Sequence, residues 1–219
     1  MKDRQFWLVS RESENPLKYR IHRELSEQIR LACEQRLGIR IDPYWFSLGN
    51  VYPDCTHHRV LHHEIDAVGG MVGRMIRRFC RWGIGSEDEI SRWRSLRLGI
   101  IAHYLCDFSC YAHTAAFDGN LREHRAYENA QLASVCPHPD FRLADAVALA
   151  DDGDALMRAI RACFAGRDPA GYSPSGDLEY AADMACGAIC EMLRLCRKKE
   201  ASLWWYHLPV IRRRHLAYA

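Results

Sequence analysis

Histidines and carboxylates recur at a four-residue spacing in the middle of the chain. His103 and Asp107 lie four residues apart in an otherwise apolar run, and His124 and Glu128 repeat that spacing. Residues four apart share one face of an α-helix, so each pair can grip a single ion. Burying a histidine and a carboxylate among apolar side chains is costly unless they are paired or bound to metal. The pattern therefore indicates metal binding on helices.

A third histidine, His113, stands between the two pairs. It lies ten residues after His103, which on a regular helix is about 80° round the axis and roughly 15 Å further along. It would not reach the ion held by His103, so we expect it to serve a neighbouring one. With His124 and Glu128 it forms a three-ligand site of the nitrogen and oxygen type that zinc accepts, with a position open for water.

Each pair also has a simpler interpretation. A single histidine and aspartate four apart are commonly just hydrogen-bonded, and a His-x-x-x-Glu on a surface helix is commonly a solvated pair. Here both pairs fall within 26 residues with a third histidine between them. That combination favours metal binding.

The spacing His103-x3-Asp107-x5-His113, followed by His124-x3-Glu128, resembles the ligand signature of bacterial zinc-dependent phospholipase C, an all-α protein with three zinc ions. The related single-strand-specific zinc nucleases share the first half of the signature. They typically end with aspartate where this chain has Glu128, so that residue favours the phospholipase branch.

The resemblance extends upstream of the signature. The segment 48–54 is similar to the family's Gly-containing, Pro-Asp loop, whose aspartate, here Asp54, binds zinc. One member of the histidine cluster that follows should match the family's next ligand: His57, His58, His62 or His63. We favour His63, with His62 second. On the first predicted helix, His22 resembles the family's N-terminal-helix histidine.

The resemblance implies two or three zinc ions. The ligands that it implies for the first ion are Asp54, His63, His103 and Asp107. Those that it implies for the second ion are His113, His124 and Glu128. Asp107 would bridge to a third ion shared with His22. In secreted relatives the third ion also takes the free amino group of an N-terminal tryptophan, whereas this chain begins with Met1. The third site is therefore absent here, or is completed by another group such as Glu24 or water.

Zinc ions at adjacent sites would support phosphoester hydrolysis. They lower the pKa of a bridging water, so that hydroxide is available near neutral pH, and they offset the charge that builds on the phosphoryl oxygens. The resemblance implies that Asp54 accepts the proton of the attacking water, which makes it the candidate catalytic residue. Tyr104, Phe108 and Phe117 are candidates for the substrate pocket, although aromatic residues at helical spacing more commonly belong to the core.

The elements that must position these residues are helical almost throughout. The apolar periodicity and cap signals predict helices at about 19–37, 63–80, 86–112, 121–134, 141–164 and 177–199, with loops at 41–58 and 166–176. No alternating, strand-like run stands out. We expect a single all-α domain over residues 1–219, of six or so helices and of the phospholipase C or zinc nuclease type.

Composition and hydropathy bear on the partners and the location of the protein. Lys and Arg total 30 against 28 Asp and Glu, which gives no indication of a nucleic-acid-binding domain. The start of the chain lacks the apolar run of a secretory signal, and no run approaches the ~18 apolar residues of a membrane span. We expect a cytoplasmic protein. Its ten cysteines include no C-x-x-C pair and are expected to be reduced, mostly as small core residues.

The predicted function is zinc-dependent phosphodiester hydrolysis of the phospholipase C type, on a phospholipid or other phosphodiester. One alternative is a nuclease or nucleotide phosphatase on the same trinuclear zinc scaffold, and another is a non-catalytic metal-binding helical protein. The basic run 212–215 follows the aromatic run 204–206. These residues could make transient contact with acidic lipid headgroups, although a solvated helix end is the simpler interpretation.

Overall fold

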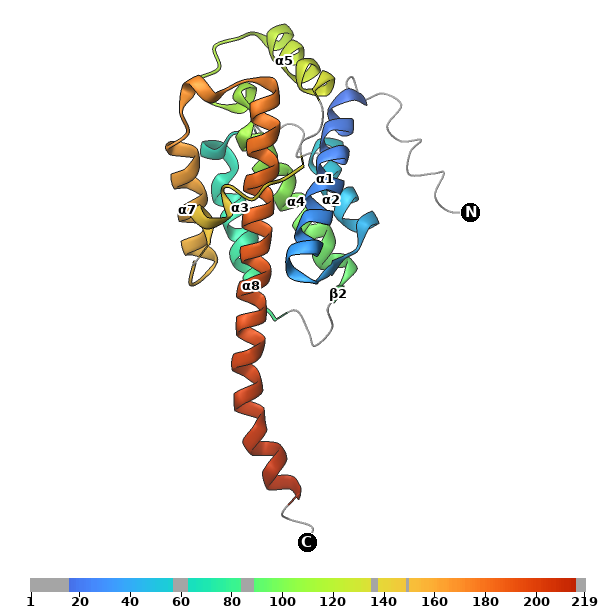
Figure 1. The fold of residues 1–219 in the computed structure, drawn as a ribbon, viewed down its shortest axis with the longest axis vertical. Coiled ribbons are helices and arrows are strands. Elements are labelled where there is room, and N and C mark those ends of the chain that lie inside the picture. Colours follow the sequence, from blue (N-terminus) through green and yellow to red (C-terminus); the bar gives the residue numbers. More distant parts are fainter. Residues whose placement is uncertain (1–15, 57–62, 84–88, 135–137, 149, 216–219) are drawn as a thin grey trace, which may run out of the picture.

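The computed structural model describes residues 16–56, 63–83, 89–134, 138–148 and 150–215. Helices account for most of them (Figure 1), as the sequence predicts, so the all-α fold class is confirmed. The α-helices are α1 (Pro16–Leu37), α2 (Pro43–Cys55), α3 (Ile65–Cys80), α4 (Arg92–Ser109), α5 (Leu121–Ala133), α6 (Ala144–Val147), α7 (Gly153–Ala165) and α8 (Pro174–His215). The short elements are β1 (Arg40–Ile41), β2 (Glu89–Ile90), η3 (Tyr111–His113) and η4 (Pro169–Gly171).

The helix α8 forms the spine of the structure. It packs against α1, α3, α4, α6 and α7, and its C-terminal part extends away from the other helices (Figure 1). Residues 181–193 of α8 are all buried, on every face of the helix. A helix that is buried on every face belongs in a core. Within the described part of the chain no helix is both long and apolar enough to cross a membrane.

The segment predicted as a loop at 41–58 is largely the helix α2, so that prediction is wrong. Its first turn is stabilised by Asp42, whose side chain accepts a hydrogen bond from the backbone N–H of Trp45 at 3.0 Å, and by Pro43 at the first helical position. The turn-forming residues that suggested a loop, Gly49 and Pro53, lie inside the helix instead.

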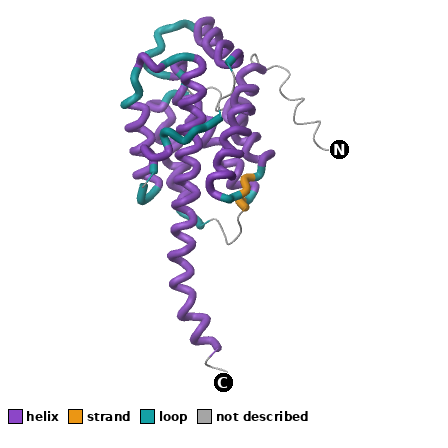
Figure 2. The backbone as a smooth tube through the Cα atoms, in the orientation of Figure 1, coloured by secondary structure: helices purple, strands orange, loops and turns teal. Residues whose placement is uncertain are grey.

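The helix predicted at 86–112 begins later and ends earlier than expected. Glu89 and Ile90 pair in parallel with Arg40 and Ile41, as two short strands that the sequence did not reveal (Figure 2). The first residue of α4 is Arg92, after the N-cap Ser91, and the helix ends at Ser109. Residues 86–88, at the predicted start of this helix, lie outside the described residues.

The single helix predicted at 141–164 is divided into α6 and α7. The α7 helix starts where the side chain of Asp152 accepts hydrogen bonds from the backbone N–H groups of Asp154 and Ala155, at 2.9 and 2.8 Å. This is a regular N-terminal cap.

The nine described cysteines form no disulfide with one another, and seven of them are buried, in agreement with their expected role as core residues.

The helices α2 and α4 cross with their backbones in contact. A Cβ atom added at Gly99 would lie 2.1 Å from the carbonyl oxygen of Phe46, and one added at Gly49 would lie 2.1 Å from that of Leu96. Both helices therefore need glycine where their backbones touch. The crossing matters for the predicted metal site, because Asp54 is on α2 while His103 is on α4.

We predict that Gly99→Ala lowers the free energy of unfolding by about 3 kcal/mol or more, because the new methyl group must push two backbones apart. Gly70→Ala is the matched control: it is also inside a helix, but the nearest atom to its added Cβ is the flexible Arg74 side chain at 3.9 Å. That variant should gain up to about 1 kcal/mol. Urea unfolding followed by circular dichroism measures both, and equal stabilities would contradict the close crossing.

Candidate metal centre

Five of the predicted ligands converge at one buried point. His22 comes from α1, Asp54 from the last turn of α2, His63 from the residues just before α3, and His103 and Asp107 from α4. Each is at most 5% exposed. Four separate segments therefore direct ionisable side chains into a region that is otherwise apolar.

Asp107 lies at the centre of this first group. Its Oδ1 is 3.1 Å from Nε2 of His22. Its Oδ2 is 2.5 Å from Nδ1 of His63 and 3.1 Å from Nε2 of His103. The two carboxylate oxygens thus face different histidines, which is the arrangement that a carboxylate bridging two ions would need.

Asp54 lies across from Asp107 in the same group. Its Oδ1 is 3.8 Å from both Nδ1 of His63 and Nε2 of His103, and its Oδ2 is 3.9 Å from Nε2 of His22. Two ligand atoms at about 2.1 Å from a tetrahedral ion are separated by about 3.4 Å. The separations around Asp54 are of that order.

A second group contains His113 of η3 with His124 and Glu128 of α5. The Oε1 of Glu128 is 3.6 Å from Nε2 of His113 and 3.2 Å from Nε2 of His124. The side chains of His113 and Glu128 are 9% and 8% exposed, whereas that of His124 is 25% exposed. This group is therefore the one with a side open to solvent.

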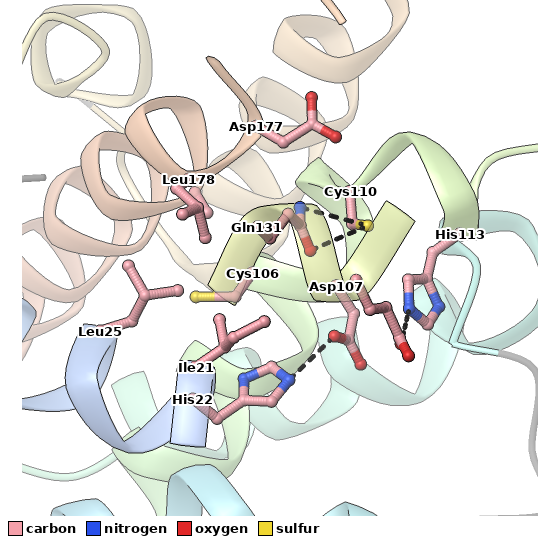
Figure 3. Close-up of a pocket in the computed structure, with 12 residues that line it drawn as sticks. Ile21, His22, Leu25, Cys106, Asp107, Cys110, His113, Gln131, Asp177 and Leu178 are labelled. Atoms are coloured by element: carbon pink, nitrogen blue, oxygen red, sulfur yellow. Dashed lines mark hydrogen bonds and ion pairs between the residues drawn. The ribbon is translucent and has the colours of Figure 1, made fainter. Parts of the chain in front are cut away.

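The two groups are neighbours. The rings of His63 and His113 stack at 6.1 Å between centroids, with 22° between their planes. Figure 3 shows His22, Asp107 and His113 lining one cavity, to which Glu128 also contributes. Carboxylates and imidazoles of both groups therefore face a shared space.

The donor atoms fit zinc. Three sets of ligand atoms lie within 4.8 Å of one another: His22, His103 and Asp107; Asp54, His63 and His103; and His113, His124 and Glu128. All offer imidazole nitrogen or carboxylate oxygen, which are ordinary ligands of zinc. The sets contain all eight residues predicted from the sequence and no others of the described chain.

His103 is held in the form that a metal ligand requires. Burial lowers the pKa of its imidazole despite the nearby carboxylates, so the ring is neutral. Its Nδ1 donates a hydrogen bond to the backbone oxygen of Asn50 at 2.8 Å, which leaves Nε2 facing Asp107. Histidines that bind metal are commonly oriented by such a bond. The sequence did not point to Asn50, because a backbone carbonyl leaves no signal in residue types.

The remaining candidate ligands and candidate pocket residues do not belong to the two groups. Glu24 is exposed and pairs with Arg20 at 2.7 Å, so it gives no donor atom to the first group. Tyr104 and Phe108 belong to the core, whereas the half-buried Phe117 packs its ring 5.8 Å from that of His124. The other ligand candidates of the histidine cluster lie outside the described residues: His57, His58 and His62.

The protein-family model described as zinc dependent phospholipase C matches residues 20–166 of the chain. The chain belongs to the zinc-dependent phospholipase C family. The match includes every residue of the two groups and confirms the family that the His103–Glu128 signature suggests. Comparisons with curated proteins and with solved structures found no match.

We predict that Asp107→Asn removes at least one zinc ion and slows hydrolysis of a p-nitrophenyl phosphodiester by about a hundredfold or more. The amide keeps the size of the side chain but loses the negative charge that allows two oxygens to hold two cations. His103→Asn should lose less metal, because only its Nε2 faces the carboxylates. Full zinc content and a near-normal rate in Asp107→Asn would leave a mononuclear site at Glu128 as the better description.

We predict that Glu128→Ala removes one zinc ion and most activity while the far-ultraviolet circular dichroism stays helical, because alanine suits the interior of α5. Asn129→Ala is the control, since Asn129 is the exposed next residue on the same helix. Elemental analysis of both purified variants measures the zinc content per chain, which should fall only in Glu128→Ala. If Glu128→Ala kept its full metal content, His124 and Glu128 would be an ordinary hydrogen-bonded pair.

Proposed function

We propose that this protein is a zinc-dependent phosphodiester hydrolase of the phospholipase C type, acting on a phospholipid or a similar phosphoester. The observation that carries the proposal is the meeting of two carboxylate–histidine groups at one cavity, inside the part of the chain that matches the family. Family membership alone supports a hydrolase, and the geometry adds a place where phosphoester chemistry could occur.

The proposed ligands follow the two groups. The first zinc ion would be held by Asp54, His63, His103 and Asp107, and the second by His113, His124 and Glu128. A third ion would lie between Asp107 and His22, whose Nε2 is 3.1 Å from Asp107 Oδ1. Because Glu24 faces solvent, the remaining ligands of that third ion would include water.

Zinc, when bound, would supply an acidified water and positive charge against the phosphoryl oxygens. The residues of the chain would orient the substrate and move the proton. We assign Asp54 as the base that takes the proton of the attacking water, since it is 3% exposed and lies across from Asp107. The partly open His124 would mark the side from which the phosphoester enters.

The alternative is a nuclease or nucleotide phosphatase built on the same ligands. Glu128, where the nucleases typically have aspartate, favours the phospholipase type.

A single domain over residues 1–219 and a cytoplasmic location both stay predictions. Contact with a membrane surface through the end of α8 is also a prediction, supported by its basic and aromatic sequence at 204–215.

Elemental analysis combined with a substrate screen tests the proposed function. We expect two or three zinc equivalents per chain, because each ion needs three or four protein ligands. We also expect hydrolysis of phosphatidylcholine analogues in preference to single-stranded DNA, and loss of both metal and activity after treatment with a chelator. Less than one transition-metal ion per chain after expression with added zinc would refute the proposal. Bound zinc with no turnover of either substrate would favour a non-catalytic metal-binding protein.

A further inference from the structure

A residue from another helix contacts the end of α4. In a continuing helix the backbone N–H of Tyr111 would donate to the carbonyl of Asp107, four residues earlier. Instead that carbonyl accepts from Cys110 at 3.0 Å, and the N–H of Tyr111 donates to Oδ2 of Asp177 at 2.7 Å. A carboxylate on α8, 66 residues later in the chain, thus takes the hydrogen bond that would prolong α4.

The same carboxylate oxygen also holds α5. The hydroxyl of Tyr127 donates to Oδ2 of Asp177 at 2.7 Å. Tyr127 is adjacent to Glu128, and it follows His124 by three residues. One oxygen atom therefore connects the turn that carries His113 to the helix that carries the other two residues of the second group.

A buried arginine completes the arrangement. Oδ1 of Asp177 accepts a hydrogen bond from Nη2 of Arg167 at 2.6 Å, and the two side chains are 1% and 5% exposed. Nη1 of Arg167 donates to the backbone oxygen of Ser109, the last residue of α4. The guanidinium carbon lies 4.2 Å from the ring centroid of Tyr172, which supports it from one side. Both carboxylate oxygens of Asp177 are therefore hydrogen-bonded, and the side chain is fixed in position.

We infer that Asp177, with Arg167, is the positioning residue that assembles the second metal group from η3 and α5. The inference rests on the proposed function, in which that group holds zinc. Asp177 does not contact a reacting atom, although it lines the same cavity as His113 and Glu128 (Figure 3). Both positioning residues follow the segment 20–166 that matches the family, so neither belongs to the matched segment.

The alternative is that the pair only stabilises the fold. A buried ion pair is weak evidence of a specific role, since removing one partner of any such pair is destabilising. The two roles predict different effects on fold stability and on zinc affinity. A purely stabilising pair would raise the stability of the whole fold and leave the relative affinities of the two metal groups unchanged, whereas a positioning pair controls the second group selectively.

Asp177→Asn tests the inference, with Asp183→Asn as the matched control. Asp183 is a buried carboxylate on the same helix that also accepts backbone N–H groups, from Asp140 at 2.9 Å and Phe141 at 3.2 Å, but it lies outside both metal groups. We expect Asp177→Asn to weaken the zinc ion of the second group, which is the ion that Glu128→Ala should remove, by about 10- to 100-fold, without weakening the others. Titration with zinc against a competing chelator measures this, and Asp183→Asn should match the wild type.

Hydrogen exchange gives a second readout that does not depend on metal. The amides of residues 111–113 should exchange faster in Asp177→Asn, and those of residues 140–141 should exchange faster in Asp183→Asn. Tyr127→Phe keeps the ion pair and removes only the bond to α5, so it decides the question if Asp177→Asn does not fold. It should weaken the same zinc ion by about 10-fold.

The outcomes separate this inference from the proposed function. Wild-type zinc affinities in both Asp177→Asn and Tyr127→Phe would overturn the inference and leave the hydrolase proposal intact. A wild-type protein that binds zinc and hydrolyses no phosphoester would overturn the proposed function, while selective zinc loss in the variants would still support the positioning role. A wild-type protein that binds no zinc would overturn both.

Discussion

The buried carboxylate of Asp107 is the constraint on which the rest of the structure depends. It is 3% exposed in the last turn of α4, and an isolated negative charge buried there would be severely penalised. Three imidazoles surround it, those of His22, His63 and His103, and each reaches it from a different segment or turn. A second carboxylate, that of Asp54, lies across from it, so two buried acidic groups share these three imidazoles. Bound cations would stabilise the two buried carboxylates. The carboxylates that are costly for the fold are therefore also the groups that suit metal binding.

The helix packing can be understood as the means of bringing these groups together. Asp54 reaches the centre only because α2 and α4 approach at backbone contact, which the glycines at positions 49 and 99 permit. That approach also places the backbone carbonyl of Asn50 against Nδ1 of His103. A larger spacing between the helices would separate the ligands and remove the bond that orients this histidine. The close crossing therefore links a packing requirement directly to the geometry of the site.

The sequence predicted the parts of this arrangement that depend on local spacing. His103 with Asp107, and His124 with Glu128, are brought together by the helical repeat alone, so residue types and spacing were enough to identify them. The family resemblance supplied the others, Asp54, His63 and His22, whose proximity comes from tertiary packing. The helix α2 was missed because Gly49 and Pro53 are turn signals when considered alone. Their tolerance inside a helix depends on a partner, α4, that local patterns do not reveal.

His113 lies beside Glu128, but not on a continuation of the helix that carries His103. A regular helix extended through His113 would place it on another face, and the expectation of a separate site followed from that geometry. In the structure α4 has already ended at Ser109, and a carboxylate from α8 accepts the hydrogen bond of the Tyr111 N–H that would have continued it. The short turn η3 then directs His113 towards Glu128 on one side and stacks it on His63 on the other. A contact between residues 66 positions apart thus lies at the turn that brings the two groups next to each other. Adjacent metal sites are one arrangement that suits phosphodiester hydrolysis.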